Sequence, residues 1–429
     1  MSDRTADFDP SDDSLISASL SWGAPALLAL MILMGQVYML AANNFAAILQ
    51  TRFLPYCLLG TFAIHMWTRP SRAEVIWTSA LAGVFALSFI VFTHQFQADW
   101  PSLVACGSFL GLASLFVLAV RVFCLRGARQ RDTCNTLIAG SIFGYSAVAI
   151  GFVLKLTATL QPRTYDLYLY AADMGFGWPL CAWVGHFVRD QLVLSKICGV
   201  GYECLPLLIS LLLAYERSGR QALPIRVLPA FLGGGVAVYV LYNVLPAAGP
   251  TFAFESAFPD HLPALASLAI QPIHLANAPR NAVPSMHLAC AVLIYWSCRR
   301  LPLWVRIGSA LYIVFTLLAT IGFGEHYVVD LVAALPYALS VQAACAPRAL
   351  RERPAVWWTF ATGAGLCIAW IAALRFAVAL FHSVAFTWLA SVTTIAVCWV
   401  AQRRFVHAER PGAKPARSGV VQPDFVGAA

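Results

Sequence analysis

Two short segments carry side chains whose types and spacing could perform catalysis. Residues 280–287 read R-N-A-V-P-S-M-H, residues 324–330 read G-E-H-Y-V-V-D, and each segment opens a long apolar run. A helix that crosses a bilayer takes about 20 residues, so two crossings separate points on the same face by about 40. His287 and His326 are 39 residues apart. We therefore expect the chain to cross and return between them, which would gather two histidines, an aspartate and an arginine at one membrane face.

His326 and Asp330 have the spacing of neighbours on one helix face, at positions i and i+4. A carboxylate there can accept the Nδ1 proton of the imidazole, which leaves Nε2 as a nucleophile or base. A structural hydrogen bond inside a helix bundle would explain the same pair. Ionisable residues are costly within a membrane span, however, and this cost favours a functional role.

The P-S-x-H sequence that ends at His287 is typical of a helix start, with Ser285 as the N-cap. The unpaired N–H groups of a helix start favour an anion. His287 would then lie where it could protonate a leaving oxygen, and Arg280 could grip a phosphate with two hydrogen bonds. Taken alone, the segment also fits a capped helix with an interfacial histidine and a snorkelling arginine.

Together the two segments resemble the type 2 phosphatidic acid phosphatase superfamily, whose second motif is P-S-x-H and whose third motif ends in H-x-x-x-D. The resemblance covers roughly residues 163–345 and implies a six-helix phosphatase-type core in the C-terminal half of the chain. It implies that His326 attacks phosphorus to give a phosphohistidine, that Asp330 orients this histidine, and that His287 protonates the leaving group.

The chain departs from the family pattern at the basic positions. Ala319 and Thr320 stand where the third motif usually begins with Ser-Arg, and the basic first motif is absent. Residues 242–250, Y-N-V-L-P-A-A-G-P, precede a long loop instead. This arrangement is similar to the inositol phosphorylceramide synthase branch, whose members are inositolphosphotransferases that move a phosphorylated head group between lipids.

With a basic motif missing, other groups must meet the phosphate charge. We expect Arg280 and Ser285 to bind phosphate. Tyr242 and Asn243 are candidate contacts for a phosphate or a lipid head group, although a polar role in the helix core fits them equally.

A metal site is the competing model, and its candidate ligands are histidines and aspartates. These are His261, His274, His287, His326, Asp260 and Asp330. A catalytic zinc needs three protein ligands in fixed geometry, and the chain has no H-E-x-x-H or similar spacing. We expect neither a metal nor another cofactor. The twelve cysteines have no C-x-x-C spacing and most lie in or beside apolar runs, so we expect small hydrophobic side chains without disulfides.

The elements that would position these residues are membrane helices. The chain is 60% hydrophobic and 11% charged, whereas a soluble domain is about 25% charged. We therefore expect an all-α, polytopic bundle of about twelve transmembrane helices. The apolar runs place them at residues 20–41, 53–67, 76–96, 103–125, 136–156, 198–215, 225–245, 285–298, 303–323, 326–345, 356–376 and 384–402.

The arginines predict which way this bundle faces. They gather in the loops after the second, fourth, sixth, eighth and tenth predicted spans, and short cytoplasmic loops are rich in basic residues. Both termini would then be cytoplasmic, and His287 and His326 would face the extracytoplasmic side. The basic residues that give the formal net charge of +8 lie in short loops between the spans. We therefore expect the lipid bilayer rather than a nucleic acid as the partner.

Five regions follow from this reading. Residues 1–18 and 403–429 would be disordered cytoplasmic tails, 19–160 an N-terminal transmembrane module of about five helices, 161–346 the catalytic domain, and 347–402 two further transmembrane helices. The predicted function is that of a membrane lipid phosphatase or phosphotransferase, a hydrolase if water is the acceptor and a transferase if a hydroxyl is. The alternatives are a membrane transporter and a pseudoenzyme that binds lipid phosphates without turnover.

Overall fold

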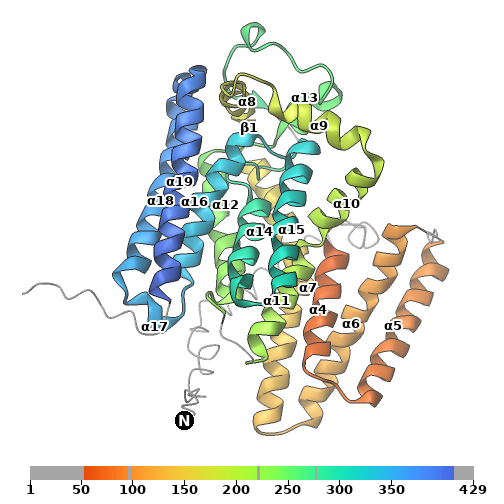
Figure 1. Ribbon diagram of the computed structural model, residues 1–429. Helices are drawn as coiled ribbons and strands as arrows, with labels where there is room; N and C mark the ends of the chain where they lie inside the picture. Colours follow the sequence, from red (N-terminus) through yellow and green to blue (C-terminus); the bar gives the residue numbers. More distant parts are fainter. Residues whose placement is uncertain (1–52, 95–98, 220–222, 276–277, 410–429) are drawn as a thin grey trace, which may run out of the picture.

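The structure, a computed structural model, describes residues 53–94, 99–219, 223–275 and 278–409 (Figure 1). The predicted span at 20–41, the predicted N-terminal tail and residues 410–429 lie outside this part of the chain. The other eleven predicted spans all contain helix, as expected for apolar segments whose main-chain groups must bond within themselves in a bilayer. The last described helix runs to Ala408, past residue 403, where the sequence predicts the start of the C-terminal tail.

The N-terminal part contributes α4 (Leu54–Trp67), α5 (Arg72–Thr93), α6 (Trp100–Cys124) and α7 (Ala128–Leu160). A capping box starts α5: Ser71 accepts the N–H of Glu74, and the Glu74 carboxylate accepts the N–H of Ser71. Helix α4 packs against α6 and α7 and also against α11 (Leu205–Arg217) of the second half. The N-terminal helices are therefore packed onto the rest of the protein.

The second half is mostly helical and carries two short strands. Its remaining elements are β1 (Arg163–Thr164), α8 (Asp166–Met174), α9 (Leu180–Asp190), α10 (Leu192–Glu203), the π-helix η2 (Pro229–Gly233), α12 (Gly234–Val244), α13 (Pro250–Phe254), the 3₁₀ turns η3 (Glu255–Ala257) and η4 (Leu265–Ser267), β2 (Ile273–His274), α14 (Met286–Ser297), η5 (Cys298–Arg300), α15 (Leu303–Gly322), α16 (Val328–Ala344), α17 (Arg348–Arg351), α18 (Pro354–Phe376), η6 (Val378–His382) and α19 (Val384–Ala408).

Six of the described helices are long and apolar enough to cross a membrane, which indicates an integral membrane protein. They are α5, α6, α7, α15, α18 and α19. Helices α10 and α11, bent by 49° relative to each other, would make a seventh span if they are counted as one. Four further helices, α4, α12, α14 and α16, have 11 to 17 residues and fall short of the ~20 that a full crossing takes. Twelve complete crossings are therefore not confirmed.

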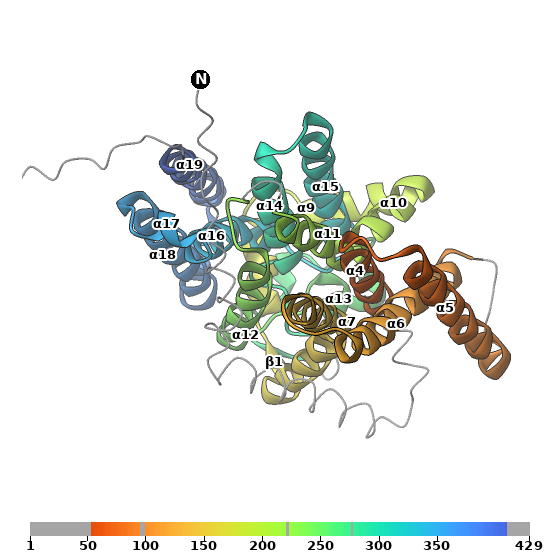
Figure 2. The same ribbon diagram turned by 90° about the horizontal axis from the view of Figure 1, so that it is seen from below.

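Helix α16 lies at the core of the second half, packed against α14, α18 and α19. Fourteen of its residues are buried, as expected for a helix that is apolar on all sides. Gly363 lets α18 approach closely, because a Cβ there would lie 2.6 Å from the carbonyl oxygen of Pro336. Seen from below, α5 and α6 form one edge of the molecule, α18 and α19 the opposite edge, and α14 and α16 lie between them (Figure 2).

The two long connections that interrupt the helices meet at one end of the bundle. Strands β1 and β2 pair antiparallel, with Arg163 opposite His274 and Thr164 opposite Ile273. Helices α8, α9 and α13 cover this end, whereas the α4–α5 and α6–α7 turns and α17, which carry arginines, lie at the opposite end (Figure 1). The fold thus places the short basic turns and the long connections at opposite ends.

Candidate active site

The structure brings His287 and His326 together. His287 is the second residue of α14 and His326 lies two residues before α16, so both sit where a helix begins. Their ring centroids are 6.5 Å apart with an interplanar angle of 62°. His326 is buried, with 1% of its surface exposed. Residues separated by 39 positions in the sequence are therefore neighbours, as the spacing predicts.

The Nδ1 proton of His326 has a main-chain acceptor. Nδ1 lies 2.9 Å from the carbonyl oxygen of Ala282, whereas the nearer Asp330 oxygen, Oδ2, is 3.6 Å away. Because a carbonyl oxygen can only accept, Nδ1 must be the protonated nitrogen. Nε2, which is buried and has no hydrogen-bond partner within the described structure, then carries the lone pair. The expected tautomer is present, but Ala282 supplies the hydrogen bond that was predicted for Asp330.

Asp330 does not accept the predicted hydrogen bond from His326, because α16 starts after His326. The helix begins at Val328, so His326 and Asp330 do not share a helical face. Asp330 Oδ2 instead accepts the N–H of Tyr327 at 2.8 Å, as part of the first turn. The main-chain oxygen of Asp330 accepts the N–H of Ser285 at 3.3 Å. Asp330 therefore joins the starts of α14 and α16 and remains beside the His326 ring.

Ser285 is the N-cap of α14, as predicted. Its Oγ accepts the N–H of Leu288 at 3.5 Å, and its side chain is fully buried. The N–H groups of the first turn of α14 lie at the positive end of the helix dipole, where an anion is favoured. Phosphate binding by Ser285 stays a prediction.

Arg280 is fully buried, and its guanidinium is occupied by main-chain oxygens. Nε donates to the carbonyl oxygen of Gln161 at 2.9 Å, and the two terminal nitrogens donate to those of Pro162, Leu275 and Ala278. These contacts tie the connection before α14 to the end of α7. Arg280 would have to give up some of these bonds to hold a phosphate, and phosphate binding by Arg280 stays a prediction.

Tyr242 and Asn243, the candidate head-group contacts, have different surroundings. The Tyr242 hydroxyl donates to the carbonyl oxygen of Pro284 at 3.4 Å, directly before Ser285. The Asn243 amide donates to Tyr239 O within its own helix at 2.9 Å. Tyr242 thus supports the start of α14, whereas Asn243 has the bond of an ordinary polar residue in a helix.

Two buried aspartates of α8, neither of them among the predicted site residues, accept hydrogen bonds from the segments around His326. Asp166 accepts the N–H groups of Ala248 and Gly249 and the hydroxyl of Tyr327 at 2.8 to 3.2 Å. Asp173 accepts the N–H groups of Val328 and Val329, both at 3.0 Å, and so caps α16. Their seven-residue spacing, two turns on one helix face, is the signal that could have identified them.

Two glycines let the connections pass close to His326. Gly249 has φ +109°, and a Cβ there would lie 2.4 Å from the carbonyl oxygen of Glu325. Gly324 has φ +69°, and its Cβ would lie 2.7 Å from the Phe258 ring. Both positions require glycine, since a side chain would clash and φ is in the left-handed region.

The His287 ring is flanked by two aromatic rings. The Tyr202 ring, from the end of α10, stacks on it with 3.8 Å between centroids and an interplanar angle of 17°. The Phe53 ring, at the N-cap of α4, lies 5.6 Å from His287 and 5.8 Å from Tyr202. No residue of the N-terminal helices is among the predicted site residues, and nothing in the sequence pattern indicates this stack.

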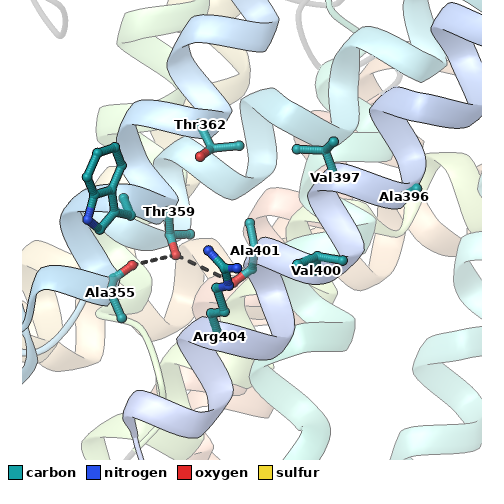
Figure 3. A pocket seen from close by; sticks show the side chains of 9 residues that line it. Ala355, Thr359, Thr362, Ala396, Val397, Val400, Ala401 and Arg404 are labelled. Carbon is teal, nitrogen blue, oxygen red and sulfur yellow. Dashed lines mark hydrogen bonds between the residues drawn. The ribbon is translucent and has the colours of Figure 1, made fainter. Parts of the chain in front are cut away.

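Two surface grooves lie away from the histidines. One, of about 260 Å³, runs between α18 and α19, where Thr359 Oγ1 donates to the Ala355 oxygen at 2.7 Å and Arg404 borders the groove (Figure 3). The other, of about 380 Å³, is apolar and lies between α4 and α11. Neither is lined by His287 or His326. Among the described residues, no three His, Cys, Asp or Glu side chains gather in a way that could hold a metal ion.

Comparison with known proteins agrees with the location of this site. No curated protein and no solved structure matches the chain. A family model described as the PAP2 superfamily matches residues 167–344, which is less than half of the 429 residues but includes His287, His326 and Asp330. This similarity indicates phosphatase-type activity. The part of the chain that forms the histidine site is thus similar to the PAP2 superfamily.

Proposed function

We propose that this chain is an integral membrane lipid phosphatase or phosphotransferase that works through a phosphohistidine on His326. The observation that carries the proposal is the state of the His326 ring. Its Nδ1 proton is held by Ala282 O, its Nε2 has no partner among the described residues, and His287 lies 6.5 Å away between ring centroids. A nucleophile and a proton donor that act on one phosphoryl group must lie near each other, and the two histidine rings do.

The reaction proceeds in two steps. Nε2 of His326 attacks phosphorus, the bond from phosphorus to the lipid oxygen breaks, and His287 gives its proton to that oxygen. In the second step an acceptor oxygen attacks the phosphohistidine, the nitrogen–phosphorus bond breaks, and His287 takes up the acceptor proton. Water as acceptor releases phosphate, whereas a hydroxyl group on a lipid or polyol yields a transferred head group. The match to the PAP2 superfamily supports phosphatase-type chemistry.

Asp330 and the start of α14 assist this chemistry. A carboxylate 3.6 Å from Nδ1 stabilises the positive charge that appears on the His326 ring when Nε2 bonds to phosphorus. The first-turn N–H groups of α14 stabilise charge on the phosphoryl oxygens. We assign the site to the extracytoplasmic side, because the arginine-bearing turns lie at the opposite end of the bundle (Figure 1).

The test compares the native protein with His326→Ala in detergent, with phosphate release and head-group transfer measured on a panel of lipid phosphates. His382→Ala, at an exposed position in η6, is the matched control. Activity in the native protein and the control together with its loss in His326→Ala supports the proposal, and the products separate hydrolysis from transfer. An acid-labile phosphoryl label that is absent from His326→Ala would identify the intermediate. A native protein that binds or transports lipid phosphates without turnover would favour the pseudoenzyme or the transporter.

A further inference from the structure

We infer that Tyr202 positions His287 for proton transfer to the leaving group, and that the N-terminal helices complete this arrangement through Phe53. The inference rests on the proposed function, since it concerns the proton donor of that reaction. It assigns a role at the site to two residues and to the N-terminal helical part.

The Tyr202 ring stacks on the His287 ring in a geometry that would fix the orientation of the imidazole. Tyr202 is 3% exposed and its ring lies nearly parallel to the imidazole, with 3.8 Å between centroids. Two flat faces in contact prevent the imidazole from turning about its last side-chain bond. The face of an aromatic ring also attracts the positive charge that an imidazole carries while it holds a proton for donation.

Tyr202 is itself fixed by contacts with the N-terminal helices. Its neighbour Glu203 accepts the hydroxyl of Tyr56 in α4 at 3.2 Å, and Trp100 at the start of α6 donates to the same hydroxyl at 3.2 Å. Phe53 packs against both Tyr202 and His287 at 5.8 and 5.6 Å between centroids. Residues of α4, α6 and α10 therefore determine where the His287 ring lies.

The bend between α10 and α11, directly after Tyr202, also helps to place the Tyr202 ring. Helix α10 ends at Glu203, and α11 continues at an angle of 49° with Pro206 in its first turn. Proline has no N–H to donate to the preceding turn, so a straight helix across this point would lose a hydrogen bond. The break directs the end of α10, and with it Tyr202, toward the start of α14.

The test uses the dependence of the rate on the leaving group. An alkyl phosphate such as a short-chain phosphatidic acid needs a proton on its departing oxygen, whereas p-nitrophenyl phosphate releases a stable phenolate without one. We expect Tyr202→Leu to lower kcat for the alkyl phosphate about 10²-fold and to change the rate with p-nitrophenyl phosphate much less, because general acid catalysis is worth about 10² to 10⁴. His287→Ala should show the same selective loss, and Tyr202→Phe, which keeps the ring face, should restore the native ratio of the two rates.

The ratio of the two rates makes the test independent of how much protein is folded. Phe53→Leu should shift the ratio in the same direction as Tyr202→Leu, and it serves as the second variant if Tyr202→Leu does not fold. Tyr145→Leu, at an exposed position of α7, is the control and should leave the ratio as in the native protein. Equal losses on both substrates in Tyr202→Leu and Phe53→Leu would overturn the inference alone. No turnover of either substrate by the native protein would overturn the proposed function and this inference with it.

Discussion

A main-chain carbonyl holds the Nδ1 proton of His326, and this changes what Asp330 contributes. In the sequence the H-x-x-x-D spacing suggests a direct hydrogen bond, but the nearer Asp330 oxygen is 3.6 Å from Nδ1 and accepts Tyr327 N–H instead. The ring orientation therefore depends on the position of the 282–285 segment. What the structure shows for Asp330 is its bond to Tyr327 N–H in the first turn of α16, beside the His326 ring.

The role of Arg280 can be tested by mutation, because a structural role and a phosphate-binding role predict different measurements. We expect Arg280→Lys to lower the free energy of unfolding by about 2 kcal/mol or more, since an ammonium group cannot satisfy four carbonyl oxygens in a buried site. KM for a lipid phosphate should change little in the fraction that stays folded. Thermal unfolding in detergent and steady-state kinetics measure the two effects. Native stability with a strongly raised KM would instead identify Arg280 as a phosphate ligand.

The start of helix α16 is capped by a residue that lies far away in the sequence. Asp173 of α8 accepts the N–H groups of Val328 and Val329, so an acid 155 residues earlier caps this helix. Burial raises the pKa of Asp173 to about 7, and the two N–H bonds act in the opposite direction. Below about pH 7 the fold therefore favours the protonated acid at this position.

This raised pKa predicts how stability depends on pH. In the unfolded chain an aspartate titrates near 3.9, so the contribution of Asp173 is fully present below about pH 4 and is lost as the pH rises toward 7. The loss is at most about 1.4 kcal/mol per pH unit. Because Asp173→Asn cannot titrate, we expect the variant to gain stability relative to the native protein between pH 4 and pH 7.

Thermal unfolding in detergent from pH 4 to pH 8 measures the difference in stability between the native protein and Asp173→Asn. Glu352→Gln, at an exposed position directly after α17, is the control for the loss of one carboxylate at the surface. A constant difference between Asp173→Asn and the native protein across this range would contradict the raised pKa.

The molecule as a whole separates its basic turns from its long connections. The α4–α5 and α6–α7 turns and α17 lie at one end, and α8, α9 and α13 cover the other (Figure 1). Several of the helices between them, including α14 and α16, are shorter than a full crossing. The long connections cover the end of the bundle where these two helices start, and there His326 is buried and His287 is half-buried.

The orientation in the membrane can be tested with cysteine labelling in intact cells. Cys124 is the exposed one among the twelve native cysteines, so Cys124→Ser gives a low background. In that background we expect His261→Cys to react with an impermeant maleimide and Arg351→Cys to react only after the membrane is permeabilised, since both positions are exposed and arginine-rich turns stay in the cytoplasm. The reverse pattern would place the site on the cytoplasmic side.

Much of the architecture and part of the site could be predicted from local patterns. Apolar runs identify where helices lie, because a membrane segment must satisfy its own main-chain groups. The 39-residue spacing brings His287 and His326 to one place, and the N-cap at Ser285 is a local signal that the structure confirms. These features depend on composition and on distance along the chain.

Tertiary packing decided the rest. The apolar runs predict twelve spans, whereas six of the described helices are long and apolar enough to cross a membrane. An apolar run in the sequence does not show how much of it forms one continuous helix. The carbonyl acceptor for His326, the Gln161 and Pro162 oxygens around Arg280, and the stack of Tyr202 and Phe53 on His287 join residues that are 44 to 234 positions apart. Such contacts leave no periodic signal in the sequence, because their partners are chosen by how the helices pack and not by the order of the chain.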